Sequence, residues 1–326
     1  MNPSAPRAAT EAAPRLVQLH RRDPAEVRRE LIEGLNAAQA ATSPKFLYDA
    51  LGSLLFEAIT ALPEYYPTRT EASILSAHAT AIAQAVGTGG TLVDLGAGNC
   101  AKALRLIPSL QPERYVGVDI SVDCLEQGLA DVQHQHPQLE VLGLGLDFAS
   151  TLALPTDTLR GRPVFFYPGS SIGNFTPEQA AVFLTSVRGQ SRDGGLLIGV
   201  DLVKDSEWLE PAYDDALGVT AAFNLNLLRH LNRLIDSDFD PRDWRHVAYF
   251  NRSASRIEMH LEARRTLVVR LPQGERTFEA GERLHTENSY KYCIEGFAEL
   301  LQSAGFTRSR CWVDAQSWFA VFWAQA

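Results

Sequence analysis

A glycine-rich segment near residue 95 carries the residues whose spacing points most clearly to chemistry. Val93-Asp94-Leu95 is the end of an apolar, strand-like run, and Gly96-Ala97-Gly98 follows it as a tight turn before a helix start. Glycines at these positions let the backbone turn sharply and approach a ligand, because no Cβ stands in the way. Asp119 ends the next predicted strand, 21 residues further on (from 98 to 119). A carboxylate there can accept both hydroxyls of a ribose, so these residues predict a nucleoside-binding site.

Two cofactor classes fit this site. The loop matches the G-x-G-x-x-G/A pattern of dinucleotide-binding proteins, so an NAD(P) oxidoreductase remains one alternative. Three features favour S-adenosylmethionine. Asp94 is an acid where dinucleotide-binding strands are usually apolar, and it can partner the ammonium of a sulfonium amino acid. Asp147 and Phe148 offer a carboxylate and an aromatic ring for an adenine, and the chain ends in a strand pair typical of class I methyltransferases. Taken singly, each acid is also explained as a solvated strand end or a helix cap.

The segments that must position these residues alternate between short apolar runs and helix-length spans. This alternation predicts a mostly parallel sheet covered on both faces, in a doubly wound, Rossmann-like α/β fold. Two runs near the C-terminus are too close together for a helical crossover, so we expect them to pair antiparallel. The predicted strands of this core are 91–95, 115–120, 141–146, 163–167, 196–202, 309–313 and 319–323.

A second part of the chain has a different pattern. Asp23-Pro24 is a helix start, a helical pattern begins at Lys45, and another spans 216–235. Further segments read as a helix over 71–86 and meander strands at 256–261, 266–271 and 275–278. We therefore predict an α+β substrate-binding domain, a cofactor-binding domain and a disordered tail. Their ranges are 19–69 with 205–290, 70–204 with 291–326, and 1–18, respectively.

Composition restricts the function classes. The net charge of −9 argues against a phosphate-binding face, so no nucleic acid partner is expected. Four cysteines lack CxxC spacing and the eight histidines lack metal-ligand spacing, so we predict no metal site. No apolar stretch approaches the roughly 20 residues needed to span a bilayer, and no secretory leader is recognisable. We expect a cytoplasmic, monomeric enzyme acting on a small molecule, with no membrane partner.

Four segments make the interpretation more specific. They read YDALGS (48–53), LPEYYPTR (62–69), FYPGSSIGNF (166–175) and TENS (286–289). In these motifs the chain, from about residue 44 to its end, closely resembles the L-histidine Nα-methyltransferases of ergothioneine biosynthesis. That family uses S-adenosylmethionine to form hercynine, the trimethylated histidine, in three transfers. The resemblance implies the same reaction for this chain.

The resemblance also implies residue roles. It places Gly96, Lys102, Asp119, Asp147 and Phe148 around the cofactor, and the chemistry of the glycine-rich loop adds Asp94 and Gly98 to this set. It makes Tyr48 the catalytic residue near the reacting amine. The implied contacts of histidine are Tyr65, Asn174, Tyr213, Met259, Glu287, Asn288 and Ser289. The loop departs from the family at residues 99–101, where Asn-Cys-Ala replaces small hydroxyl residues and an acid, and this departure bears on cofactor affinity.

The chemistry of these side chains agrees with the implied roles. Methyl transfer is an in-line attack by a nitrogen lone pair, so it needs positioning and a deprotonated amine. Asn174 and Tyr213 can hold a carboxylate, while Glu287 and Ser289 can bind the two nitrogens of an imidazole. Such two-ended binding rejects a substrate that lacks one partner, because buried polar groups would be left unpaired.

Simpler explanations remain open for the same residues. Tyr65 can pack an interdomain loop, Asn174 can organise a helix start, and Lys102 can be a solvated helix residue. Glu287 to Ser289 can be a surface strand end. At the level of function, the alternatives are methylation of another amine, an NAD(P) oxidoreductase, and a binding module that holds the cofactor without turnover.

Overall fold

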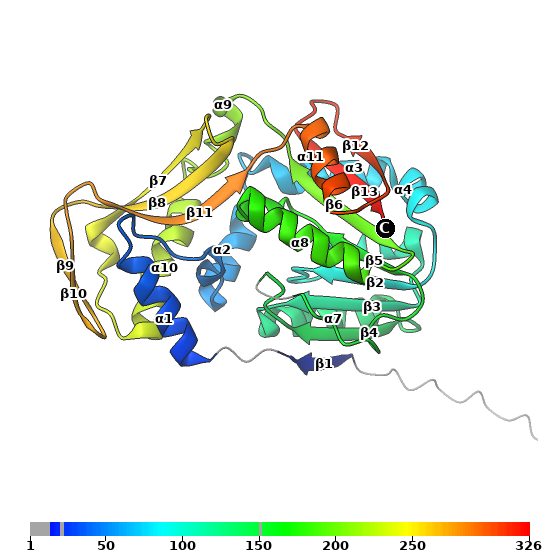
Figure 1. The fold of residues 1–326 in the computed structure, drawn as a ribbon, viewed down its shortest axis with the longest axis horizontal. Coiled ribbons are helices and arrows are strands. Elements are labelled where there is room, and N and C mark those ends of the chain that lie inside the picture. Colours follow the sequence, from blue (N-terminus) through cyan, green and yellow to red (C-terminus); the bar gives the residue numbers. More distant parts are fainter. Residues whose placement is uncertain (1–13, 20–22, 150–151) are drawn as a thin grey trace, which may run out of the picture.

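The core of the molecule is an eight-stranded sheet (Figure 1). The computed structural model describes residues 14–19, 23–149 and 152–326. The strand order is β1-β4-β3-β2-β5-β6-β13-β12, and all neighbours are parallel except that β13 is antiparallel to both β6 and β12. The strands are β1 (Arg15–Gln18), β2 (Thr91–Leu95), β3 (Arg114–Asp119), β4 (Glu140–Gly145), β5 (Pro163–Tyr167), β6 (Gly195–Asp201), β12 (Arg308–Val313) and β13 (Phe319–Gln325). The predicted Rossmann-like core with an antiparallel C-terminal pair is confirmed.

Helices cover both faces of this sheet, and each face has its own apolar layer. The covering helices are α3 (Tyr66–Ala77), α4 (Ala79–Val86), α5 (Ala101–Leu104), α6 (Ile107–Leu110), α7 (Val122–Gln135), α8 (Pro177–Gln190) and α11 (Ile294–Ser303). The predicted helix over 71–86 begins earlier, at Tyr66, and is interrupted at His78. Thr176 forms a full capping box with Gln179 at the start of α8, so that helix does not need Asn174 as its cap.

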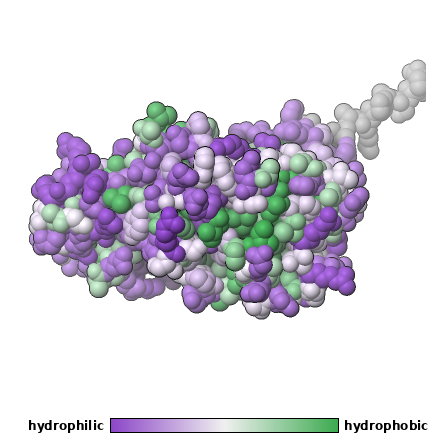
Figure 2. Space-filling view, turned by 90° about the horizontal axis from the view of Figure 1, so that it is seen from above, coloured by the Kyte–Doolittle hydropathy of each residue, from purple (hydrophilic) through white to green (hydrophobic). Residues whose placement is uncertain are grey.

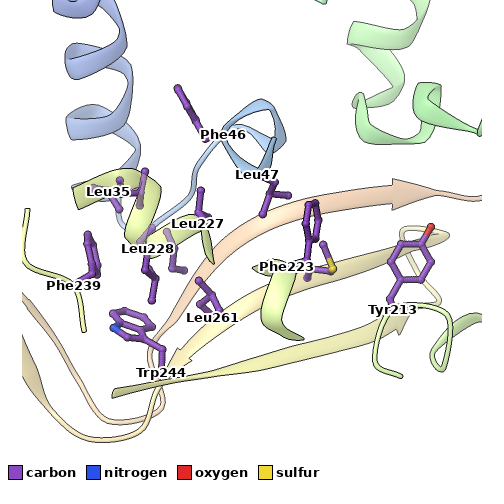
Figure 3. Packing of buried hydrophobic residues seen from close by; sticks show 14 of the residues in the cluster. Leu35, Phe46, Leu47, Tyr213, Phe223, Leu227, Leu228, Phe239, Trp244 and Leu261 are labelled. Carbon is purple, nitrogen blue, oxygen red and sulfur yellow. The ribbon is translucent and has the colours of Figure 1, made fainter. Parts of the chain in front are cut away.

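A second layered unit lies beside the carboxyl ends of the central strands (Figure 1). Its helical elements are α1 (Pro24–Leu35), η1 (Pro44–Leu47), α2 (Ala50–Thr60), α9 (Ser206–Leu209), α10 (Val219–Ile235) and η3 (Pro241–Asp243). Its strands are β7 (Trp244–Asn251), β8 (Arg256–Ala263) and β11 (Arg283–Tyr290), which form one antiparallel sheet, and the hairpin β9 (Leu267–Leu271) with β10 (Gly274–Phe278). Figure 3 shows the hydrophobic core of this unit. Phe223 and Tyr213 lie at one end of it, and the Tyr213 hydroxyl points away from the aliphatic residues.

The hydrophobic clusters support the proposed division into two domains. One cluster draws its residues from 27–66 and 209–284, and the two clusters of the large sheet draw theirs from 74–202 and 297–324. The buried members of the two sets do not mix, and Trp318 contacts the first cluster from the other set. We therefore keep 19–69 with 205–290 and 70–204 with 291–326 as the proposed domains.

Two expectations about local structure were wrong. Residues 15–18 fall in the predicted disordered tail but form β1, which pairs in parallel with β4, while residues 1–13 lie outside the described residues. Composition cannot reveal such pairing, because the backbone groups of a sheet edge accept a strand of almost any sequence. The helix predicted from Lys45 is broken at Tyr48, because Asp49 caps a new helix by accepting a hydrogen bond from the Gly52 N–H at 2.8 Å.

The surface is mainly polar, in keeping with the charged composition. Figure 2 shows one face of the molecule, on which hydrophobic residues gather near the middle while the two ends are largely hydrophilic. Within the described residues, no helix combines the length and the apolar character needed to cross a membrane.

Candidate active site

The glycine-rich loop closes over the end of β3. Gly96 and Gly98 have φ of 71° and 50°, a left-handed conformation that favours glycine. The Gly98 N–H donates to Asp119 Oδ2 at 2.8 Å, and the Ser121 N–H donates to Asp119 Oδ1 at 2.8 Å. Asp119 therefore ties two loops together and leaves further lone pairs for a ligand. This is the arrangement expected of a carboxylate that binds a ribose diol.

Asp94 lies beneath the same loop and is buried. It accepts a hydrogen bond from the Tyr115 hydroxyl at 2.8 Å through Oδ2, whereas Oδ1 has no hydrogen-bond partner among the described residues. Burial raises the pKa of the Asp94 carboxyl to about 7, against the opposing effects of Tyr115 and Lys102. An orphaned carboxylate oxygen in this position fits a ligand that carries an ammonium group.

The remaining predicted cofactor residues surround the loop. Phe148 lies 3.7 Å from the point where a Cβ on Gly96 would be, and its ring packs edge-to-face on Tyr167. Asp147 is buried, with Oδ2 3.7 Å from Lys45 Nζ. An apolar ring beside a carboxylate suits an adenine, which needs a flat surface and an acceptor for its amino group. The predicted set therefore converges at the carboxyl ends of β2, β3 and β4 and fits S-adenosylmethionine.

Lys102 connects this region to the loop that follows β5. Its Nζ is 2.9 Å from Glu71 Oε2, and Glu71 Oε1 accepts the Gly169 N–H at 2.8 Å. Lys102 is thus ion-paired and only about one third exposed, which excludes the simple solvated role. Glu71, on α3, was missed by the sequence analysis, because nothing in a helical pattern marks which polar residue will be buried.

A cavity lies between the two units, and its lining residue Gly169 adjoins Lys102, which follows the glycine-rich loop. Its walls come from α2, α10, β8, β11, the 3-10 turn at 171–174 and the loops at 48, 65, 169–170 and 212–213. The lining residues are Tyr48, Phe56, Ile59, Tyr65, Gly169, Ser170, Ser171, Asn174, Ala212, Tyr213, Thr220, Phe223, Met259, Glu287 and Ser289. Seven of the eight residues predicted to contact the amine or the rest of histidine are among them.

Asn288 is the exception, and its prediction as a substrate contact is corrected. Successive side chains of a strand point to opposite faces, so Asn288 faces away from the cavity into which Glu287 and Ser289 point. Its Oδ1 is 2.9 Å from Nε2 of His285 on the outer face of the sheet. The register of β11 against β8 places Glu287 opposite Met259, which brings these two residues together in the cavity.

An aromatic wall runs along one side of the cavity. The Tyr48 ring packs edge-to-face on Phe56 and Phe223, with 5.5 Å between ring centroids in each pair. Tyr65 continues the wall from Phe56 to Tyr213, with centroid distances of 6.1 and 6.2 Å. Burial, together with the nearby Glu287 carboxyl, raises the pKa of Tyr48 well above its usual value, so its phenol stays neutral. Aromatic faces of this kind can hold a methylated ammonium.

Glu287 is the acidic group of the cavity. It is only 7% exposed, and no described residue donates a hydrogen bond to its carboxyl group. Burial raises its pKa to about 7, and the Lys291 ammonium opposes this shift only in part. A buried carboxyl group without a partner is costly. Its presence therefore indicates a ligand that brings an N–H or a cation.

Tyr213, at the end of the aromatic wall, and Ser289, on β11, form a pair of hydroxyls with 2.8 Å between their oxygens. Asn174 lines the same cavity from the 3-10 turn η2 (Ser171–Asn174), which packs on β11 so closely that a Cβ on Gly173 would be 2.8 Å from Tyr290 O. Only glycine permits this approach. The cavity thus combines an acid, an amide and this bonded pair of hydroxyls with an aromatic wall.

A buried ionic group behind this pair of hydroxyls escaped the sequence analysis. Lys291 contacts both hydroxyls and is paired with Asp201, which also binds Lys204. One signal was available in the sequence: Glu287, Ser289 and Lys291 are spaced by two, so on an extended chain they share a face. Lysines are so rarely buried that sequence reasoning assigns them to the surface by default.

A Rossmann-like sheet whose glycine loop, acidic strand end and adjoining amine-sized cavity are arranged in this way defines a class I methyltransferase. The model of the family described as histidine-specific, SAM-dependent methyltransferases matches residues 27–326. This chain belongs to that family. Its methyl donor is therefore S-adenosylmethionine, which decides between the two cofactor classes that the loop alone left open.

Curated relatives support the same assignment. The histidine N-alpha-methyltransferases of Mycobacterium tuberculosis and Mycolicibacterium smegmatis are each 40% identical to this chain, over 303 and 302 residues. Each alignment covers 90% of this chain and 93% of the relative. Ergothioneine biosynthesis protein 1 of Neurospora crassa is 34% identical over 279 residues, which are 82% of this chain and 31% of that larger protein.

Proposed function

We propose that this enzyme transfers three methyl groups from S-adenosylmethionine to the α-nitrogen of L-histidine and so forms hercynine. One observation carries the proposal. Glu287 and Ser289 lie two residues apart on one face of β11, and both line the cavity that has the aromatic wall. An imidazole is the side chain whose two nitrogens match an acid and a hydroxyl placed side by side. The 40% identical relatives named for histidine Nα-methylation support the same substrate.

Each group of residues has a proposed binding role. Asp119 accepts the ribose hydroxyls, Phe148 packs on the adenine, and Asp94 partners the ammonium of the cofactor. When bound, S-adenosylmethionine supplies an electrophilic methyl group on a sulfonium. Asn174 and Tyr213 donate to the substrate carboxylate. Most residues that line the space are buried, which strengthens each of these polar contacts.

Tyr48 is assigned to the reacting amine. Its neutral phenol oxygen accepts a hydrogen bond from an amine N–H, which orients the nitrogen lone pair and offers a route for the proton to solvent. Loss of the proton is favoured close to a sulfonium, because like charges disfavour the ammonium form. As methyl groups accumulate, the faces of Tyr48 and Tyr65 stabilise the growing cation.

Tyr48→Phe is expected to lower kcat by about 10- to 100-fold while the KM for L-histidine changes by less than about 3-fold. The ring and its edge-to-face contacts are retained, and only the hydroxyl that orients the amine is lost. Steady-state kinetics on both parameters test this. Tyr249→Phe is the matched control. The Tyr249 hydroxyl donates to Glu258 on the face of the β7-β8-β11 sheet that points away from the cavity. An unchanged kcat would remove Tyr48 from the reaction.

The proposed reaction is tested by mass spectrometry. Purified protein is incubated with S-adenosylmethionine and L-histidine, and the product is fragmented to locate the added mass. Three methyl increments on the α-nitrogen would support the proposal as stated. A product with one or two increments would revise the number of transfers. No product, in a sample that binds S-adenosylhomocysteine by calorimetry, would reject histidine and favour methylation of another amine.

We also propose that the enzyme works in the cytoplasm as a monomer without a metal ion. The four cysteines are free thiols, which is the usual state in a reducing compartment. Sedimentation of the purified protein tests the monomer, and unchanged activity after treatment with a chelator tests the absence of a metal.

A further inference from the structure

Lys291 is the most completely buried cation described in the chain, with 0% of its side chain exposed. Its Nζ lies 2.9 Å from the Tyr213 hydroxyl, 2.8 Å from Ser289 Oγ and 2.7 Å from Asp201 Oδ2. An ammonium has three protons, so these three contacts use all of them. Lys291 does not line the cavity, but both hydroxyls that it contacts do.

The charges around Lys291 do not cancel. Asp201 is 1% exposed and is bound by two ammonium groups, since Lys204 Nζ lies 2.6 Å from its Oδ1. The Tyr66 hydroxyl donates to the same carboxylate. Burial alone would raise the pKa of Asp201, but Lys291 and Lys204 hold it below its usual value, so Asp201 is ionised. Burial lowers the pKa of Lys204 to about 8, so at neutral pH Lys204 is mostly charged. One carboxylate against two ammonium groups then leaves a buried positive charge in excess.

The two hydroxyls connect the Lys291 ammonium with the cavity. Lys291 donates to both oxygens, and Tyr213 and Ser289 also bond to each other. One of their two protons is used between them, and one remains for the cavity. If Tyr213 provides it, the Ser289 oxygen presents a lone pair to a ring N–H, and with Glu287 as acceptor for the other nitrogen the ring binds as an imidazolium. A phenol that accepts from an ammonium is a stronger donor, and a carboxylate is the acceptor that benefits most from it.

We propose that Lys291 is a positioning residue that supplies the positive charge for the substrate carboxylate, acting through the hydroxyl of Tyr213. The inference rests on the proposed function, since it assumes an α-amino acid in the cavity. Glu287, the acid of the cavity, is engaged by the imidazole in that arrangement, so the excess charge of the lysine pair is left for the carboxylate. Lys291 thereby makes the enzyme select amino acids over amines that lack a carboxylate.

Lys204 provides a matched control. It neutralises the same Asp201 but contacts Tyr66 at 2.7 Å and the Leu202 carbonyl, and neither is in the cavity lining. Removal of either lysine leaves Asp201 paired with the other and with Tyr66. Neither single variant therefore creates an unpaired buried charge, which would be strongly destabilising.

The test measures binding with calorimetry in the presence of S-adenosylhomocysteine, using L-histidine and its neutral α-carboxamide, L-histidine amide. In Lys291→Met the Kd of L-histidine is expected to rise by about 10- to 100-fold, while the Kd of the amide changes by less than about 3-fold. Lys204→Met is expected to change both Kd values by the same factor. In a Tyr213→Phe background, Lys291→Met should raise the Kd of L-histidine by less than about a further 3-fold, because the hydroxyl through which Lys291 acts is already absent.

Equal weakening of both ligands by Lys291→Met would show a purely structural role and overturn the inference, and so would an unchanged Kd of L-histidine. If Lys291→Met fails to bind S-adenosylhomocysteine, Lys291→Gln replaces it with the same expectation, since it retains two N–H donors without the charge. If the wild-type protein binds neither ligand and does not turn over L-histidine, the proposed function fails and this inference fails with it.

Discussion

Glu287→Gln is expected to lower kcat/KM for L-histidine by about 100-fold or more and to raise the melting temperature of the ligand-free protein at pH 8. The loss of activity follows from recognition of the ring. A carboxylate accepts the imidazole N–H through a charge-assisted hydrogen bond, whereas an amide offers a weaker acceptor and turns a donor toward the ring in its other orientation. A buried site built for a polar partner discriminates strongly when that match is lost.

The gain in stability follows from the pKa of Glu287. Burial raises it from 4.5 to about 7. A raised pKa means that the folded state holds the proton more tightly than the unfolded chain. The carboxyl group therefore contributes stability below pH 4.5, and this contribution is lost as the pH rises from 4.5 to about 7. At pH 8 the ionised group opposes folding by at most about 3 kcal/mol. Glutamine has no charge and avoids this cost.

Thermal unfolding of both proteins at pH 4.5 and pH 8, with kinetics at pH 8, tests the two expectations together. The melting temperatures should lie closer at pH 4.5 than at pH 8. Glu299→Gln, at an exposed position of α11, makes the same chemical change and should alter neither stability nor activity. If histidine turnover survived in Glu287→Gln, Glu287 would not bind the ring, and another amine would become the better candidate substrate.

The large sheet was predictable because its strands are buried on both faces. Val116 and Phe165, for example, belong to runs in which nearly every residue is apolar, and such runs have few alternative structures. The antiparallel C-terminal pair followed from the short connection alone. Sequence thus determines this half of the fold through local rules that need no knowledge of distant contacts.

The sheet that carries Glu287 was harder to predict. β11 was not recognised as a strand, because polar side chains occupy both of its faces. One face lines the cavity, and on the other, His285 binds Asn288 and contacts the ring of His260. A strand with two polar faces has no alternating hydrophobic pattern. The family resemblance identified Glu287 where periodicity could not.

The ionic group at Lys291 shows a second limit. Burial of a charge depends on the partners that the fold brings together, and Asp201 is 90 residues away from Lys291 along the chain (from 201 to 291). Neither the end of β6 nor the residue after β11 suggests the other. A pattern in the local sequence can show which residues share a face, but it cannot show what lies behind that face.

Asp119→Ala is expected to weaken the binding of S-adenosylhomocysteine by about 100- to 1,000-fold, because the carboxylate has two tasks. It is the proposed acceptor for the ribose hydroxyls, and it orders the cofactor loop through the N–H groups of Gly98 and Ser121. Calorimetry measures the affinity. Asp131→Ala, at an exposed position of α7, removes the same charge and should leave the affinity within about 2-fold.

Asp119→Asn separates the two tasks. Its amide oxygen can still accept one loop N–H, so the loop is better supported than in the alanine variant, but an amide is a weaker acceptor for a diol. Burial raises the pKa of Asp119 while the backbone hydrogen bonds oppose the shift, so removal of the charge is not expected to destabilise the ligand-free fold. Weak cofactor binding by Asp119→Asn at an unchanged melting temperature would therefore assign the loss to the diol. Wild-type affinity in Asp119→Asn would instead show that Asp119 acts only by ordering the loop.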